Sequence, residues 1–297
     1  MIRNINGVQT IRIHVFALYS AIVVGVSMIS GCAAIVSSTN VRMTDNLSYA
    51  ILNNDDLDTV ETGGPAYLLM IDSMLRDDPD NSVLLRTAAT LYSAYTAVFI
   101  ADKTRSQKLT EKALEYAFRA VCLRKPDVCA FRTGNFKAFA DAVAETDARD
   151  VPDLYALGAA WSGWIQARSD DWNAISEIPR VETVMQRVVA LNEFYKDGEA
   201  HLYLGIFATL LPPALGGKPE LGRKHFERAM EISGHKNLMV NVTYARQYAR
   251  MMFDRELHDR LLKEVLKTDP YVPGYVLVNI YAQKTAKDLL DSADDFF

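Results

Sequence analysis

Apolar residues recur every three or four positions along most of this chain, from about residue 57 to its end. In the segment LYALGAAWSGWIQAR, one face of a helix would carry four apolar side chains, those of Leu154, Leu157, Trp161 and Ile165. The alternation of apolar and polar residues that is typical of a half-buried strand is almost absent. The pattern therefore predicts an all-α protein.

Three prolines are expected to follow the ends of helices, because the residue before a proline is pushed away from the α-helical region. They are Pro79, Pro126 and Pro270, and each follows a charged residue. Residues thirteen, nine and six positions before each proline form matching sets, and a fourth segment carries an equivalent set. The sets are Ala66, Met70 and Ser73; Ala113, Ala117 and Ala120; Leu257, Leu261 and Glu264; and Gly222, Phe226 and Ala229.

Leu-Gly pairs stand upstream of these sets, at Leu157-Gly158 and Leu204-Gly205. Small residues let two helices approach closely, while a larger one fills the gap between them. The combination resembles the tetratricopeptide repeat, in which a first helix carries Leu-Gly and a second carries the small-large-small set. The spacing from Ala245 to Leu257 fits a standard repeat, but Gly205 to Gly222 carries five extra residues and Ala88 to Ala113 carries thirteen. We expect a degenerate tetratricopeptide-like array of roughly four helix pairs, the first half complete.

The segment LLPPALGGKP, residues 210–219, interrupts the helical pattern, and we call it the elbow. Pro212 and Pro213 are expected to end one helix, and Pro219 is well placed to begin the next. Gly216 and Gly217 permit a positive φ angle. The spacing of a phosphate-binding loop is missing, and the segment follows a helix instead of a strand. The elbow is therefore predicted to be a rigid connector.

The N-terminus has the features of an export signal. Arg3 and Arg12 precede an apolar run that ends in Ile29-Ser30-Gly31-Cys32, which resembles the lipobox of bacterial lipoproteins. We interpret residues 1–31 as a signal peptide, Cys32 as the lipidated residue, residues 32–56 as a polar tether and residues 57–297 as the helical domain. Ala33 after the cysteine favours the outer membrane, facing the periplasm. The alternative is a permanent transmembrane helix, since the run is long enough to span a bilayer.

Composition restricts the kinds of partner. The formal net charge is −5, and removal of residues 1–31 would leave 30 basic and 37 acidic side chains, or −7. No basic tract is present, so binding to nucleic acid is not expected. The 49% hydrophobic residues are enough to bury a core.

Cys122 and Cys129 stand seven residues apart. An oxidising periplasm would permit a disulfide between them. Two independent buried thiols are the alternative, because free cysteine is often buried. A metal site is not expected, because no histidine lies nearby to complete a tetrahedron.

Catalytic motifs are absent from the sequence. The five histidines form no short metal-binding spacing, and no Gly-x-Ser-x-Gly elbow appears. The segment RDDPDN, residues 76–81, lacks the rest of a calcium loop and is better interpreted as a turn with an Asp or Asn helix cap. We therefore expect no enzymatic activity and no cofactor.

Aromatic side chains cluster on three predicted helices. The residues are Tyr92, Tyr95 and Phe99; Trp161 and Trp164; and Tyr203 and Phe207. Spacings of three and four are what core packing requires, so each is favoured as a core residue. The alternative is a ligand pocket, because helical-repeat arrays present a concave surface where aromatic clusters bind apolar molecules.

The chain is similar to a known family. The elbow with its following helix, LPPALGGKPELGRKHFERAMEIS, the lipobox and the segment AYLLMIDSMLRDDPDNSVLLRTAATLYSAY together resemble the T component of TRAP transporters, often called TatT. The resemblance extends over the whole mature chain. It implies an all-α lipoprotein that forms a homotrimer and works with the periplasmic substrate-binding (P) component of the transporter. It also implies a cleft lined by apolar residues, and no enzymatic activity.

The resemblance suggests where partners or a small apolar ligand would bind. Candidates are the seven aromatic residues above and the elbow residues Leu211, Pro212, Pro213, Leu215, Gly216, Gly217 and Lys218. The alternative function is a tetratricopeptide-like scaffold lipoprotein of the cell envelope with no role in transport.

Overall fold

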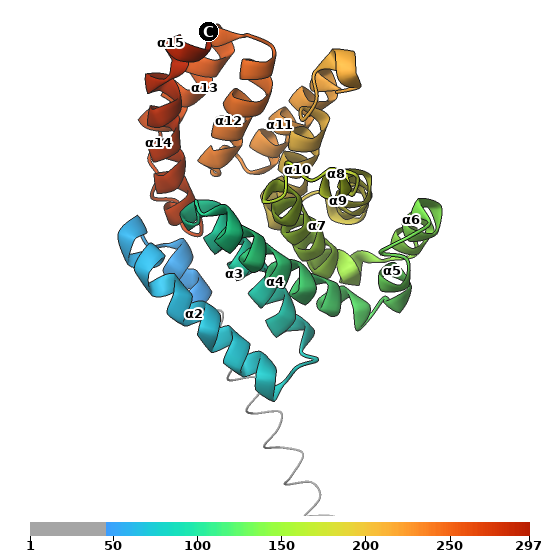
Figure 1. The fold of residues 1–297 in the computed structure, drawn as a ribbon. Coiled ribbons are helices and arrows are strands. Elements are labelled where there is room, and N and C mark those ends of the chain that lie inside the picture. Colours follow the sequence, from blue (N-terminus) through green and yellow to red (C-terminus); the bar gives the residue numbers. More distant parts are fainter. Residues whose placement is uncertain (1–45) are drawn as a thin grey trace, which may run out of the picture. The chain divides into compact units, whose positions relative to one another are not determined.

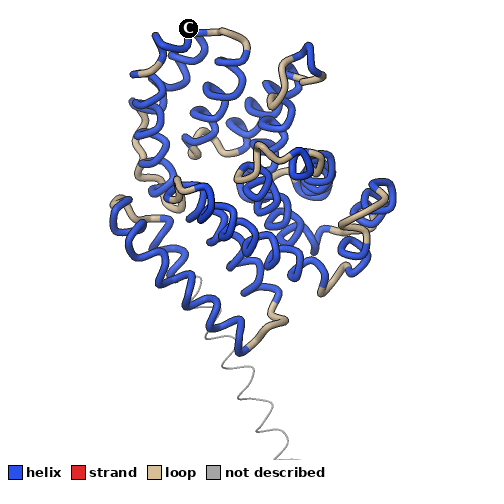
Figure 2. Tube along the Cα trace, viewed as in Figure 1, coloured by secondary structure: helices blue, strands red, loops and turns tan. Residues whose placement is uncertain are grey.

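The computed structural model describes residues 46–297. The predicted signal peptide, Cys32 and the first part of the tether lie outside these residues. Helices make up 78% of the structure, and the part of the chain that is described contains no strand (Figures 1 and 2). The prediction of an all-α protein is confirmed.

Fourteen α-helices of four residues or more follow one another from residue 57 to the C-terminus of the described chain. They are α2 (Leu57–Asp77), α3 (Ser82–Phe99), α4 (Lys103–Cys122), α5 (Pro126–Ala130), α6 (Phe136–Ala144), α7 (Val151–Gln166), α8 (Trp172–Ile175), α9 (Ile178–Asn192), α10 (Glu199–Ala208), α11 (Pro219–Ile232), α12 (Leu238–Tyr244), α13 (Arg255–Lys267), α14 (Val276–Asp291) and α15 (Ala293–Phe296). Single 3-10 turns η1 (Ala148–Asp150), η2 (Tyr195–Gly198) and η3 (Pro213–Leu215) connect some of them, and a π-helical turn, η4 (Ala245–Ala249), extends α12.

Local sequence explains where these helices begin. Asn81 accepts hydrogen bonds from the backbone N–H groups of Val83 and Leu84, both at 3.1 Å, and so caps α3. This is the cap predicted for the segment RDDPDN. Asp56, Asp102 and Asp254 cap other helices in the same way. Each cap satisfies backbone donors that have no partner within the helix.

Helices that are close in sequence pack as neighbours: α2 on α3, α3 on α4, α7 on α9 with the short α8 between them in the chain, α10 on α11, and η4 with α12 on α13 (Figure 1). The predicted Leu-Gly positions are close contacts. A Cβ atom on Gly158 would lie 2.6 Å from Met185 Cε, and one on Gly205 would lie 2.7 Å from Phe226 Cε1. These two contacts join α7 to α9 and α10 to α11, which is the pairing expected between the first and the second helix of a repeat. Their assignment to the tetratricopeptide class remains an interpretation.

Unequal repeat spacing has two structural causes. The thirteen extra residues between Ala88 and Ala113 do not form an inserted loop, because α3 and α4 are 18 and 20 residues long and three residues connect them. The extra residues between Gly205 and Gly222 are those of the elbow.

Buried side chains form two separate apolar cores. The first core contains residues from Leu68 to Leu204, among them the fully buried Trp161, while the second contains residues from Phe226 to Leu289. Helix α10 contributes to both: Leu204 belongs to the first core, and Leu202 and Ile206 pack against the second. One helix thus forms the boundary between two packed units.

The two cysteines lie at the junction of α4 and α5. Their Cα atoms are 5.8 Å apart and their sulfur atoms are bonded. The turn between them contains Pro126, which begins α5. The fold therefore accommodates the predicted disulfide, whose formation in the cell stays a prediction.

The last residues of the predicted tether differ from an extended polar segment. Residues 48–52 are helical, the Asn53 side chain accepts a hydrogen bond of 2.7 Å from the Gly274 backbone, and the Tyr271 hydroxyl lies 3.3 Å from Asp55. Asn and Asp side chains form such bonds to backbone and hydroxyl donors readily. Helix α2 still begins at Leu57, the predicted start of the helical domain. Between residues 46 and 297, no helix is both long and apolar enough to cross a membrane.

Candidate functional site

The elbow joins α10 to α11 and is closed by its own backbone hydrogen bonds. The Lys218 N–H donates to the Ala208 carbonyl at 2.8 Å, and the Gly217 N–H donates to the Pro212 carbonyl at 3.2 Å. Pro219 is the first residue of α11, as predicted. Helix α10 ends at Ala208, four residues before Pro212, because Thr209 already terminates it. The prediction that the two prolines end the helix was therefore wrong by one turn.

The two adjacent glycines serve different purposes. Gly216 has a φ angle of 92°, in the left-handed region where glycine alone avoids a steric penalty. Gly217 was predicted to have the same role, but its φ angle is not positive. A Cβ atom on Gly217 would lie 1.6 Å from the Leu211 carbonyl oxygen, so glycine is required there by close backbone approach. The elbow consequently requires glycine at two successive positions, at Gly216 for its φ angle and at Gly217 for the close approach of the backbone.

Several elbow side chains face solvent. Leu211 is 49% exposed and Leu210 is 43% exposed, and Pro212, Pro213 and Lys218 are exposed as well. The side chain of Leu215 lies outside what the structure describes. An exposed apolar pair on a rigid turn is available for contact with another molecule.

The aromatic candidates divide into core and half-buried residues. Trp161 is completely buried, and Tyr92 and Tyr95 retain only 3% and 8% of their accessible surface. The Tyr92 and Tyr116 hydroxyls both donate to Asp72, at 2.8 and 2.7 Å, so Tyr92 belongs to a satisfied internal network. Phe99, Trp164, Tyr203 and Phe207 are half-buried. The last two lie one turn apart on α10, immediately before the elbow.

Four tyrosines from separate elements converge on one carboxylate, and we call this group the tyrosine–glutamate cluster. It consists of Tyr155 on α7, Tyr195 on η2, Tyr203 on α10, Tyr275 before α14, and Glu199 at the start of α10. The Tyr155 hydroxyl donates a short hydrogen bond to Glu199 Oε2, and Asn237 Nδ2 donates to Oε1 at 3.5 Å. The Tyr155 ring meets those of Tyr195 and Tyr203 edge-on, with centroids 5.4 and 6.3 Å apart.

The electrostatics of this cluster are unusual. Burial raises the pKa of the Glu199 carboxyl, and the hydrogen bond from Tyr155 and the charge of the nearby Lys196 offset only part of this effect. Burial and the charge on Glu199 also raise the pKa values of Tyr155 and Tyr203. Burial, the hydrogen bond to Asp197 and the charge on Glu199 raise the pKa of Tyr275. Within residues 46–297, no lysine, arginine or histidine forms an ion pair with Glu199. The carboxylate therefore receives hydrogen bonds and an electrostatic contribution from Lys196, but no direct ion pair from the described residues.

Backbone strain accompanies the cluster. Lys196, Asp197 and Gly198 have φ angles of 51°, 51° and 79°, three successive left-handed residues of which two are not glycine. For the two residues other than glycine, such conformations cost about 1–3 kcal/mol each and persist only where surrounding contacts impose them. One such contact is the short hydrogen bond from the Tyr275 hydroxyl to Asp197. Sequence periodicity gave no indication of this group, because its members are far apart in the chain.

A pair of histidines lies beside the same helix. The Nδ1 atoms of His201 on α10 and His225 on α11 are 2.8 Å apart, so one ring donates to the other. Burial lowers the pKa of His201 and, with the neighbouring His201, lowers the pKa of His225 to about 4. Glu193, which is bound by Arg228, lies 3.5 Å from His201 Nε2 on the other side of the ring. Both histidines are thus favoured in their neutral form.

This pair should make the protein less stable in mild acid. The unfolded histidine binds a proton below pH about 6.5, whereas folded His225 resists protonation down to about pH 4. The stability due to this effect is present above pH 6.5 and is lost as pH falls toward 4. The free energy of unfolding of the wild-type protein should fall between pH 7 and pH 4.5. After allowance for solvent screening, we expect this fall to be smaller in His225→Gln by on the order of 1 kcal/mol. Urea unfolding at both pH values measures it, with His235→Gln, at an exposed position, as control. Parallel losses in wild type and His225→Gln would contradict the prediction.

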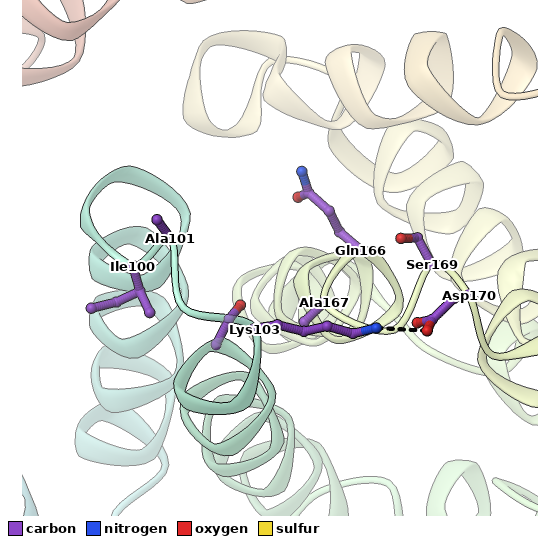
Figure 3. Close-up of a pocket in the computed structure, with 8 residues that line it drawn as sticks. Ile100, Ala101, Lys103, Gln166, Ala167, Ser169 and Asp170 are labelled. Atoms are coloured by element: carbon purple, nitrogen blue, oxygen red, sulfur yellow. Dashed lines mark hydrogen bonds and ion pairs between the residues drawn. The ribbon is translucent and has the colours of Figure 1, made fainter.

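A shallow pocket of about 280 Å³ lies elsewhere, between the end of α3, the start of α4 and the end of α7 (Figure 3). Lys103 and Asp170 form an ion pair of 2.6 Å across it, and Ile100 and Gln166 lie on its two sides. It contains none of the predicted site residues. In the described part of the chain, no three His, Cys, Asp or Glu side chains are arranged to hold a metal ion.

Comparison with known proteins agrees with the resemblance seen in the sequence. No curated protein matches the chain. The profile described as "TRAP transporter T-component" matches residues 53–297, which include every described helix from α2 onward, the elbow and the tyrosine–glutamate cluster. This match covers far more than half of the sequence. The chain belongs to the TRAP transporter T-component family.

Proposed function

We propose that this protein is the periplasm-facing accessory component of a TRAP transporter and binds its substrate-binding (P) component through the elbow. The family consists of transport accessory proteins and is not an enzyme family. In keeping with this, we assign no catalytic role to the chain. The observation that supports the elbow as the contact is its exposed Leu210 and Leu211 on a backbone that is already fixed. A rigid segment loses little conformational entropy when it binds.

Substitution of the elbow tests this proposal. Leu211→Ser and Lys218→Ala should each weaken binding of the P component about tenfold or more, which corresponds to about 1.4 kcal/mol. Neither side chain takes part in the backbone hydrogen bonds that close the elbow, so helicity and oligomer size should be unchanged. Leu69→Ser is the matched control, because Leu69 is 69% exposed on α2. Affinity for the P component is measured by biolayer interferometry. Unchanged affinity in both folded elbow variants would leave the elbow as a structural connector.

We also propose that Cys32 is acylated and holds the protein in the outer membrane, facing the periplasm. Several acyl chains bury enough methylene groups for stable attachment, at about 0.8 kcal/mol each. Cys32→Ala should therefore move the protein from the membrane to the soluble fraction, with loss of incorporated labelled palmitate. Cys122→Ala is the matched control and should remain membrane-bound. A Cys32→Ala protein that stays in the membrane would favour a permanent transmembrane helix.

Two further features of the family extend the proposal. A homotrimer would present three elbows to the transporter. The half-buried Tyr203 and Phe207, on one face of α10, are our candidates to line the cleft for an apolar ligand. A T component that bound neither the P component nor a small molecule would correspond to the alternative, a scaffold of the cell envelope.

A further inference from the structure

The two ends of the described chain meet one another. Arrays of helical repeats are ordinarily open, because each repeat contacts only its neighbours. In this protein α2 contacts α14, and the starts of the two helices lie side by side (Figure 1). Just before these helices, the Gly274 N–H donates a hydrogen bond of 2.7 Å to Asn53 Oδ1. The Tyr271 hydroxyl donates one of 3.3 Å to Asp55 Oδ2. The segment before α2 therefore closes the array against the loop before α14.

This closure is polar. Neither of the two apolar cores contains a residue from segments 48–56 or 268–275. Asn53 is half-buried, and Asp55 and Tyr271 are exposed, so water competes for these hydrogen bonds. Regions with few buried apolar contacts and solvent-exposed hydrogen bonds open at a lower free energy than packed cores. The closure is therefore expected to open before either core unfolds.

Asn53 holds both sides of the closure with one side chain. Its Nδ2 atom donates to the Tyr49 carbonyl at 2.8 Å, at the end of the short helix that precedes it, while its Oδ1 atom accepts from Gly274. Gly274 has a φ angle of 85° and stands immediately before Tyr275, the residue that precedes α14. The hydrogen bond to Asn53 therefore fixes the backbone beside this tyrosine.

Tyr275 carries the contact to the strained turn η2, because its hydroxyl donates to Asp197. The two ends of η2 are held by packing, Tyr195 against the first core and Gly198 against α11. Between them, the left-handed residues Lys196 and Asp197 are exposed. The hydrogen bond from Tyr275 holds this exposed part. Residues in such conformations persist only while their contacts impose them, so the turn should relax when Tyr275 is released.

We propose that residues 53–55 form a releasable strap that couples the N-terminal segment to the η2 turn, with Asn53 as its closing residue. While the strap is closed, Gly274 is fixed and Tyr275 keeps Asp197 in its left-handed conformation. When the strap opens, the loop before α14 moves away and the turn relaxes. Because η2 directly precedes α10, the strap sets the conformation at the boundary between the two cores. The inference concerns this chain alone and does not depend on binding of the P component.

Hydrogen exchange of the full chain in detergent, followed by mass spectrometry, tests this coupling. Asn53→Ala should speed exchange at least threefold both in residues 270–276 and in residues 195–200, and should leave α3 unchanged. Asn54→Ala is the matched control, because Asn54 is also half-buried but its Oδ1 atom accepts from the Asp56 N–H, at 2.8 Å, within the same segment. Unchanged exchange in residues 195–200 of Asn53→Ala, or the same change in Asn54→Ala, would overturn the proposal.

A second variant checks the route of the coupling. Tyr275→Phe removes the hydroxyl that reaches Asp197, so it should speed exchange in residues 195–200 by a similar factor and leave the hydrogen bond between Gly274 and Asn53 in place. In the double variant, exchange in residues 195–200 should rise no further than in Tyr275→Phe alone, because both substitutions release the same contact. An additive increase would mean that the strap and the tyrosine act separately, which contradicts the proposal.

Discussion

Replacement of Trp161 by alanine is expected to destabilise the protein by about 3–5 kcal/mol, the largest loss that we predict for a single side chain. The Trp161 ring is completely buried, and it meets the rings of Phe118 and Phe139 at centroid distances of 4.9 and 5.9 Å. Its Nε1 atom donates no hydrogen bond to the described chain, so the loss comes from packing alone. Urea unfolding followed by circular dichroism measures the change.

Trp164, one turn further along α7, is the control for this prediction. It is half-buried, donates to Glu111 at 2.6 Å and stacks against the Arg168 guanidinium. Trp164→Ala should cost about 1 kcal/mol, because these contacts are partly solvated. Equal losses for the two variants would mean that Trp161 does not anchor the first core.

Gly205→Ala should destabilise the protein by about 1–3 kcal/mol, although alanine ordinarily favours a helix by about 0.5–1 kcal/mol over glycine. The new Cβ atom would lie 2.7 Å from Phe226 Cε1. Phe226 cannot move aside easily, because it is fully buried and stacks on Tyr244 with centroids 5.2 Å apart. Thermal and urea unfolding of the variant measure the cost.

Two comparisons isolate the cause. Gly163→Ala on α7 should be stabilising, because the nearest atom to its Cβ would be 3.8 Å away. Phe226→Leu should recover part of the loss in the Gly205→Ala background, and a double-mutant cycle measures this coupling. A stable Gly205→Ala protein, or additive effects in the cycle, would show that close approach of α10 and α11 does not require glycine.

The sequence predicted those parts of the fold that depend on local pattern. A helical period of apolar residues, Asn81 as a cap and Pro219 as a helix start all act within a few residues, so they are visible without coordinates. The Leu-Gly pairs were also informative, because a glycine inside a helix lowers its stability and so indicates a close neighbour. Gly217 shows the limit: whether a glycine provides a left-handed φ angle or avoids a carbonyl group depends on atoms outside its immediate sequence.

The candidate site was only partly predictable. Exposure of Leu211 and Lys218 follows from their position in a turn between helices. The convergence of Tyr155, Tyr195 and Tyr275 on Glu199 depends on how α7, η2 and α14 pack, and nothing in their spacing predicts it. The seven aromatic residues singled out from their spacing show that a correct helix assignment does not reveal a residue's role. Periodicity located them on helices correctly, but the same spacing serves Trp161 in the core and Tyr203 in the cluster.

The division of the buried side chains into two cores has a consequence for biosynthesis. A chain that emerges N-terminus first from a ribosome or a secretion channel presents every residue of the first core, up to Leu204, before any residue of the second. Cooperative units of this kind can form separately, and domains generally fold in order of emergence. The nascent chain would then expose the α10 side chains Leu202 and Ile206 until α11 and α12 arrive to cover them. Along the proposed export route, this exposed face of α10 is a surface that a chaperone would cover until α11 and α12 have emerged.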